Sequence, residues 1–198
     1  MMAVRGRPRA FDEEEVLDVA MQLFWEHGFD GTSMSELTEA MGINRRSVYA
    51  AFGNKEALFT SALERYLAGP GAFVKKALAL PTAREVAECF LRGTVKAATS
   101  SDRPSGCMIV QSALTCSDAA AAVRSDVAAR RVAGVDAFHE RFDRAQLDGD
   151  MPADVDTQAL ASYIVALSNG ISVQANSGIG RAALSRTVEL ALSTWPSA

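Results

Sequence analysis

The stretch that decides the fold is Ser33-Met34-Ser35-Glu36-Leu37-Thr38-Glu39-Ala40-Met41-Gly42-Ile43-Asn44-Arg45-Arg46-Ser47-Val48-Tyr49-Ala50-Ala51-Phe52-Gly53-Asn54-Lys55. It predicts two short amphipathic helices joined by a tight turn. Ser33 followed three residues later by Glu36 is the pattern of a capping box, which begins a helix. Gly42 supplies the positive φ that ends this helix, and Asn44 caps the next one. Two helices joined by a turn that contains glycine form a helix-turn-helix, whose second helix can enter the major groove of DNA.

The outer face of the second helix carries polar and cationic side chains. Its apolar residues face inward at helical spacing, which leaves Arg45, Arg46 and Tyr49 pointing outward. Residues 44–55 contain these two arginines and Lys55 but no acid. Such a face suits contact with phosphates and base edges, and the alternative interpretation is an ordinary solvated helix face.

Overall charge argues weakly against DNA binding, because the net charge is -4 and the pI is near 5.3. The distribution of charge matters more than the sum. The positive charge of the N-terminal region gathers in residues 44–55 and in residues 1–9, which hold Arg5, Arg7 and Arg9 without an acid. This basic arm is expected either to reach a DNA minor groove or to be a disordered tail without function.

Apolar periodicity is helical almost throughout, so the chain is predicted to be all-α with about nine or ten helices. We expect a flexible basic arm over residues 1–9, a helix-turn-helix domain over 10–53, a connecting helix over 54–71, and a larger helical domain over 72–198. Helices outside the quoted stretch are predicted near Asp12 to His27, Asn54 to Ala68, Phe73 to Leu80, Thr82 to Thr99, Cys107 to Thr115, Ala119 to Leu147, Val155 to Ser177 and Arg181 to Trp195.

Several classes of protein are disfavoured. No run of about 18 apolar residues could span a membrane, and no apolar signal segment follows the N-terminal arginines, so a cytoplasmic location is expected. Three cysteines without CxxC spacing and two isolated histidines indicate neither a disulfide framework nor a metal centre, and no cofactor is predicted. The sequence also lacks a phosphate-binding loop and a nucleophile with an adjacent base, so an enzyme is not expected.

The last two helices mix small residues with apolar ones, which permits close helix approach. Two such helices from each of two chains can form a four-helix dimer interface, or the pair can simply close the core of one chain. A homodimer is favoured because two related helix-turn-helix units read a palindrome with more specificity than one. The predicted interface stripe is Leu160, Ile164, Leu167, Ile171, Leu184, Val188 and Leu192.

The segment from about residue 10 to residue 60 resembles the DNA-binding domain of the TetR/AcrR family of bacterial transcriptional regulators. The resemblance rests on Gly28-Phe29, Thr32-Ser33, Met41-Gly42-Ile43, Val48-Tyr49, Phe52, Asn54-Lys55 and Leu58. It implies a homodimeric repressor that binds an operator in double-stranded DNA and leaves it when a small-molecule effector enters the C-terminal domain. By position, Arg45, Arg46 and Ser47 would face bases, and Ser33, Tyr49 and Lys55 would contact phosphates. Asn44 and Asn54, at the starts of their helices, complete the predicted DNA-contacting set with Arg5 and Arg7.

The effector is expected to be hydrophobic or aromatic. The middle helices carry an apolar and aromatic set with one amide, which either lines a cavity or is plain core. Its members are Phe90, Cys107, Met108, Gln111, Leu114, Phe138 and Phe142.

Cys107 opens an alternative. It follows Gly106 near the predicted start of a helix, where the dipole favours a thiolate, so oxidation or an electrophile could release the repressor from DNA. The opposing interpretation is a small buried hydrophobe. Two more remote alternatives are a helical protein-interaction domain and an enzyme without a DNA function.

Overall fold

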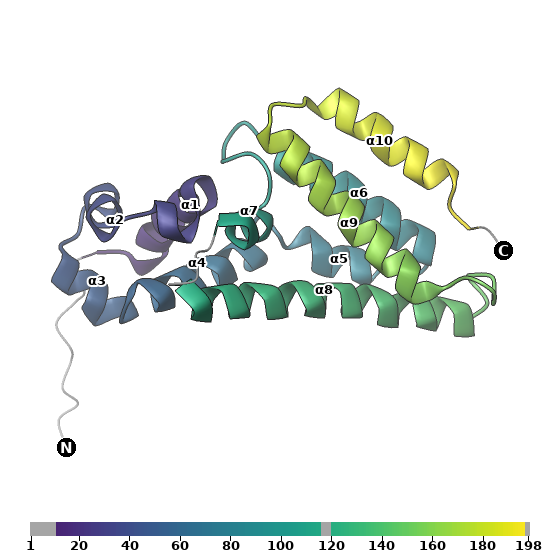
Figure 1. Cartoon of the computed structure of the whole chain (residues 1–198), viewed down its shortest axis with the longest axis horizontal. Coiled ribbons are helices and arrows are strands. Elements are labelled where there is room, and N and C mark those ends of the chain that lie inside the picture. Colours follow the sequence, from purple (N-terminus) through teal and green to yellow (C-terminus); the bar gives the residue numbers. More distant parts are fainter. Residues whose placement is uncertain (1–10, 116–119, 197–198) are drawn as a thin grey trace, which may run out of the picture.

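The computed structural model describes residues 11–115 and 120–196. Regular structure in these ranges is entirely helical, which confirms the predicted all-α fold (Figure 1). No helix in the same ranges combines the length and the apolar character needed to cross a membrane. The helices are α1 (Glu13–Gly31), α2 (Met34–Met41), α3 (Arg45–Phe52), α4 (Lys55–Ala68), α5 (Phe73–Leu78), α6 (Ala83–Ala98), α7 (Met108–Thr115), α8 (Ala121–Leu147), α9 (Thr157–Asn176) and α10 (Arg181–Ser193).

Local sequence signals fix where the N-terminal helices begin and end. The Ser33 hydroxyl accepts a hydrogen bond from the Glu36 backbone N–H at 3.1 Å, and the Glu36 carboxylate accepts one from the Ser33 N–H at 3.4 Å. This is the predicted capping box, and α2 ends at Gly42 with φ +65°. One boundary differs from the prediction. Gly28, expected to end the first helix, has φ +72° and kinks the chain, and Phe29 to Gly31 add a last turn to α1.

A first hydrophobic cluster joins α1 to α4. Phe24 and Phe59 are fully buried and meet edge to face with centroids 5.2 Å apart, and Trp25 meets Tyr66 in the same way at 4.8 Å. At the surface, the Arg65 guanidinium on α4 donates two hydrogen bonds of 2.8 Å to the Asp18 carboxylate on α1. These bonds lower the pKa of Asp18. The two helices are therefore held together both by aromatic packing and by a bidentate ion pair.

This cluster also takes in residues from far along the sequence. Helix α7 packs against α1, with Met108 fully buried, and Val123 and Val127 of α8 belong to the same cluster. Figure 1 shows α7 beside α1, and α8 running along most of the molecule. The hydrophobic clusters consequently do not divide at residue 72, where the sequence suggested a new domain.

A second cluster fills the C-terminal half. Helix α6 packs against α5, α9 and α10, and α9 packs against α8. An aromatic row of Phe90, Phe138, Phe142 and Trp195 runs through it, with successive ring centroids 4.4, 6.1 and 5.8 Å apart. The row links α6, α8 and the segment that follows α10 into one core.

The apolar stripe predicted as a dimer interface lies inside this second cluster. The five residues Ile164, Ile171, Leu184, Val188 and Leu192 are each at most 5% exposed within a single chain. Leu160 and Leu167 are partly buried against the same core. This contradicts the interface prediction for the five buried residues, because side chains buried in their own chain leave no surface for a partner. With this stripe, the pair α9 and α10 closes the core of its own chain.

Gly93 in α6 tests how tightly α5 and α6 are packed. A Cβ at this position would overlap the Phe73 ring, coming within 3.0 Å of Cγ. Gly93→Ala should lower the free energy of unfolding by about 1 to 2 kcal/mol, because overpacking outweighs the gain in helix propensity. Gly134→Ala in α8 is the control, since a Cβ there meets nothing within 4 Å. It should raise the free energy of unfolding by up to about 1 kcal/mol. Urea unfolding followed by circular dichroism measures both free energies. Equal changes in the two variants would contradict the tight contact between Gly93 and Phe73.

Candidate nucleic-acid interface and cavity

The turn between α2 and α3 consists of Gly42, Ile43 and Asn44. The Ile43 N–H donates to the Thr38 carbonyl at 3.2 Å, which closes the end of α2. The Asn44 side-chain oxygen accepts from the Ser47 N–H at 2.9 Å, which begins α3. Val48, 1% exposed, fixes α3 to the N-terminal cluster. The predicted helix-turn-helix geometry is therefore present, with one face of α3 buried and the other turned outward.

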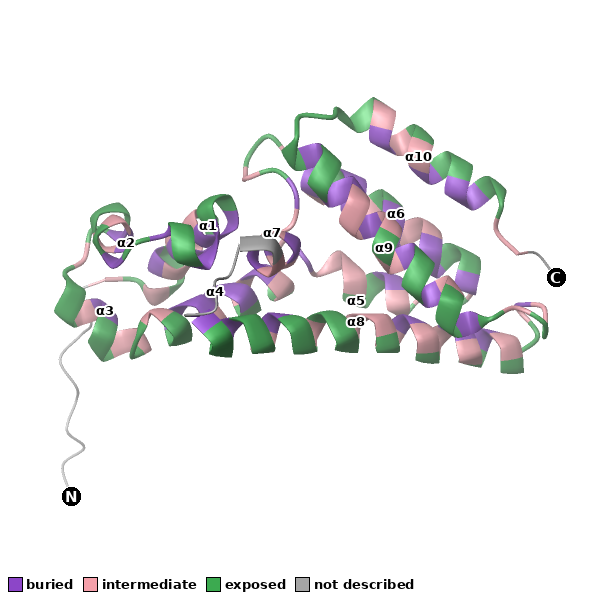
Figure 2. Cartoon of the chain, in the orientation of Figure 1, coloured by how far each residue is buried: buried purple, intermediate pink, exposed green. Residues whose placement is uncertain are grey.

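The outward face of α3 is cationic. Arg45, Arg46 and Tyr49 are exposed, and Ser47 is half-buried. The Arg45 guanidinium lies 5.8 Å from the centroid of the Tyr49 ring, one helical turn further on. No acidic residue occurs in α3 itself. Figure 2 shows α3, with exposed stretches, at the end of the molecule opposite α10.

Three predicted contact residues are also helix caps. The side-chain oxygens of Ser33, Asn44 and Asn54 each accept a backbone N–H, and Asn54 does so from Ala57 at 2.7 Å. Their remaining donors, one hydroxyl and two amide NH₂ groups, are what these side chains keep for an external partner. All three lie at helix starts, where unpaired N–H groups and the helix dipole favour an anion.

Lys55 lies at the first position of α4 and is half-buried. Its Nζ sits 4.2 Å from the centroid of the Phe29 ring, so the ammonium group is held against the end of α1 by a cation–π contact. The structure thus places a positive charge beside α3 and ties it to the N-terminal cluster. Arg5 and Arg7, the predicted contacts of the arm, lie outside the described residues.

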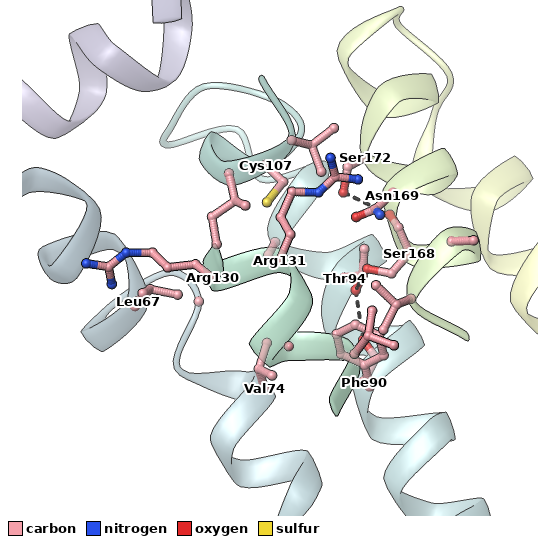
Figure 3. A pocket seen from close by; sticks show the side chains of 18 of the residues that line it. Leu67, Val74, Phe90, Thr94, Cys107, Arg130, Arg131, Ser168, Asn169 and Ser172 are labelled. Carbon is pink, nitrogen blue, oxygen red and sulfur yellow. Dashed lines mark hydrogen bonds between the residues drawn. The ribbon is translucent and has the colours of Figure 1, made fainter. Parts of the chain in front are cut away.

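A cavity of about 540 Å³ opens between the two halves of the chain (Figure 3). Its walls come from α4, α5, α6, α8 and α9 and from the segment around Cys107 at the start of α7. Phe90, Cys107 and Phe138 line it, as the sequence suggested. Two residues that sequence analysis missed also line it, Tyr66 and Leu67 of the connecting helix α4. The cavity therefore touches the helix whose first residue is Lys55.

Two other predicted lining residues point elsewhere. Phe142 lies one turn beyond Phe138 and packs against Trp195, so it belongs to the closed core. Gln111 is absent from the cavity wall, and its side-chain oxygen accepts from the Asn176 amide at 3.4 Å. Met108 lies in the first cluster, and the side chain of Leu114 lies outside the described residues. The predictions for Phe142 and Gln111 were wrong because helical spacing shows which residues share one face of a helix. It does not show which part of the protein that face contacts.

Tyr66 and Cys107 meet at the cavity wall. The Tyr66 hydroxyl donates to the Cys107 Sγ at 3.3 Å. Burial raises the pKa of Tyr66 well above its ordinary value, and the neighbouring Cys107 raises it further, so the phenol stays protonated and acts as the donor. Cys107 precedes α7, and its carbonyl accepts from the Gln111 N–H at 2.9 Å. The thiol is thus placed at a helix start and faces the cavity.

Comparison with known proteins supports the resemblance to the TetR/AcrR family. Residues 16–62 match the model of the family described as bacterial regulatory proteins, tetR family. The chain is 32% identical to the HTH-type transcriptional repressor ComR of Escherichia coli K12 over 97% of its own length and 92% of that protein.

Solved structures extend the likeness. A cysteine mutant of the TetR family transcriptional regulator CifR, complexed with 26-base-pair double-strand operator DNA, is 43% identical, with a TM-score of 0.91. The match covers 96% of this chain and 100% of that one. A putative TetR transcriptional regulator from Rhodococcus sp. RHA1 is 40% identical over 94% of this chain and all of that one, with a TM-score of 0.64.

Proposed function

This chain belongs to the TetR family of bacterial regulatory proteins, and we propose that it is a transcriptional repressor that binds an operator in double-stranded DNA through α3. The observation that carries the proposal is the exposed, acid-free cationic face of a helix held at the correct place in a helix-turn-helix. The operator complex of the CifR mutant, which shares this fold at 43% identity, supports it. Members of this family are regulators and not enzymes.

The side chains around α3 divide into two roles. Arg45, Arg46 and Ser47 project where a helix in the major groove meets base edges, and an arginine fork matches the O6 and N7 acceptors of guanine. Tyr49 and Lys55, with the helix starts at Ser33, Asn44 and Asn54, surround this face and would receive phosphates. The caps preorganise the second group, because each helix start is fixed before DNA arrives.

A homodimer is proposed through the outer face of α9 and α10. With the former stripe buried in the chain, that face presents Tyr163 at 48%, Val173 at 43% and Leu190 at 69% exposed. Between Tyr163 and Val173 on the same side of α9 lie Ala166 and Gly170, which are small enough for close helix approach. Exposed large apolar residues on neighbouring helices favour contact with a second copy of the chain.

The cavity is proposed to hold the effector that releases the repressor. Tyr66 and Leu67, in the last part of α4, form part of its wall, while Asn54 and Lys55 stand at the other end of the same helix. A ligand that displaces the last turns of α4 would move its first turn as well, because a helix shifts as a rigid body. The separation between the two α3 helices of a dimer would then no longer match the operator.

Cys107 supports a second candidate, a repressor released by an electrophile. Its thiol lines the cavity and accepts a hydrogen bond from Tyr66 on α4. An adduct on Sγ would displace this hydrogen bond and add volume between α7 and α4. The covalent and the reversible candidates therefore act through the same helix.

Variants at Arg46 and Lys55 separate base reading from phosphate contact. Arg46→Ala should weaken operator binding about 10- to 100-fold and relax specificity at one base pair, as loss of a bidentate contact worth about 1 to 3 kcal/mol implies. Lys55→Ala should weaken binding to all sequences and reduce the salt slope by about one. Fluorescence anisotropy on matched and altered operators at several salt concentrations measures both. Arg144→Ala, on the exposed surface of α8, is the control. An Arg46→Ala variant that binds like the parent would refute the proposed interface.

The dimer surface is tested by adding charge. Leu190→Glu combined with Tyr163→Glu should convert the dimer to a folded monomer, because a carboxylate without a partner is costly to bury between two helices. The matched control is Leu147→Glu, at an 88% exposed apolar position near the end of α8. Light scattering gives the mass and circular dichroism confirms the fold. A double variant that remains dimeric would place the interface elsewhere.

The role of Cys107 is tested with a thiol reagent. If release needs a reversible ligand alone, Cys107→Ser binds operator and responds to the inducer as the parent does. If an adduct at Cys107 causes release, iodoacetamide dissociates the parent from operator and leaves Cys107→Ser bound. Cys89→Ser is the control, since Cys89 packs against the second cluster and does not line the cavity. Cys116 lies outside the described residues. Release that persists in Cys107→Ser would eliminate the covalent candidate.

A further inference from the structure

The inner wall of the cavity contains hydroxyl groups, but toward a ligand it behaves as an apolar surface. The Thr94 hydroxyl lies 2.9 Å from both the Phe90 carbonyl and the Ser168 hydroxyl, and the Ser172 hydroxyl donates to the Ser168 carbonyl at 3.0 Å. These groups thus hydrogen-bond to the protein itself. A ligand that lies against them needs no polar atoms of its own at that depth, so hydrocarbon or an aromatic ring fits the inner space.

The charge on the cavity wall has one sign. Arg130 and Arg131 of α8 line it, and no acidic residue is among the lining residues of the described chain. Arg130 is already neutralised, because its Nε lies 3.1 Å from the Asp126 carboxylate and its guanidinium also approaches Glu64 of α4 at 3.7 Å. Arg131 forms neither an ion pair nor a hydrogen bond with any described residue. Among the residues that the structure describes, it is therefore the lining charge without a counterion.

Figure 3 shows the two arginines diverging. Arg130 extends toward α4, whereas Arg131 extends across the cavity toward Asn169 and Ser172 of α9. Arg131 is exposed, and so are the lining residues Ala128 and Val132 beside it. This exposed side is the mouth of the cavity. The guanidinium is consequently reachable from water while the space behind it is apolar, and Asn169 adds an amide on the opposite wall.

We propose that the cavity binds an amphipathic anion, with its apolar body against the Phe90 and Phe138 side and its carboxylate held by Arg131 at the mouth. A guanidinium fork pairs with a carboxylate through two parallel hydrogen bonds, and a cationic or neutral head group gains no such contact. The inference rests on the proposed function and deepens it, since it names the chemical class of the effector. It also makes Arg131 the residue that selects the head group of the ligand.

The test compares three head groups on one hydrocarbon chain. Decanoate, 1-decanol and decylammonium, each below its micelle concentration, are titrated into the full-length protein by isothermal calorimetry. Decanoate should bind at least about tenfold more tightly than decanol, the factor that about 1.4 kcal/mol represents. Decylammonium should bind most weakly. Decanoate should also release the protein from operator DNA in the anisotropy assay.

Variants assign the preference to Arg131. Arg131→Gln should bind decanol as the parent does but lose the preference for decanoate, and Arg131→Lys should keep part of it because the charge remains. Arg144→Gln, elsewhere on α8, should leave all three affinities unchanged. Equal binding of decanoate and decanol by the parent, no binding of either, or equal losses for both in Arg131→Gln would each overturn the inference. Operator binding without any ligand is measured on the same samples, so a failure here stays distinct from a failure of the DNA-binding proposal.

Discussion

The packing of α4 against α1 is the constraint on which the rest of the structure depends. Phe59 and Leu63 bury one side of α4 in the first cluster, and Arg65 binds Asp18 across the surface. This contact fixes the orientation of α4, and with it the positions of Asn54 and Lys55 beside α3. The other end of α4 supplies Tyr66 to the cavity wall. One helix thus belongs to the core, to the proposed DNA face and to the proposed effector site, so none of the three can change independently.

Helix α8 forms the second connection between the halves. Its first turns carry Val123 and Val127 into the first cluster, and its later turns carry Phe138 and Phe142 into the second. Between them, Arg130 pairs with Glu64 of α4 next to the cavity. The cavity lies between the first and the second hydrophobic cluster. Helix α8 passes through both clusters, and the space beside its middle turns is filled by neither. A binding space at this junction follows from having two cores along one continuous helix.

The sequence predicted the helix caps and turns, which depend on neighbouring residues. It did not predict which side chains are covered by helices distant in the sequence. Caps at Ser33, Asn44 and Asn54, and the turn at Gly42, depend on residues within a few positions, and all were correct. The apolar stripe of Ile164 and Leu184 was identified, but its periodicity is the same whether the covering helix comes from the same chain or from another. Phe138 and Phe142 share one stripe, yet only the distant Trp195 decides which of them is closed off. Tyr66 and Arg131 were missed because a cavity has no pattern in sequence. The adjacent arginines in α8 were the one available signal.

The edge contact between Trp25 and Tyr66 has an optical consequence. Trp25 is buried in the first cluster, and the ring it touches forms part of the cavity wall. The other tryptophan, Trp195, lies against Phe142 at the far side of the second core. Indole emission is sensitive to the polarity and rigidity of its surroundings, so a molecule that moves Tyr66 changes the spectrum of Trp25 and leaves that of Trp195 as an internal reference. The chain therefore contains its own fluorescent reporter of cavity occupancy, placed on α1 against α4, the helix that connects the cavity to the DNA-reading end.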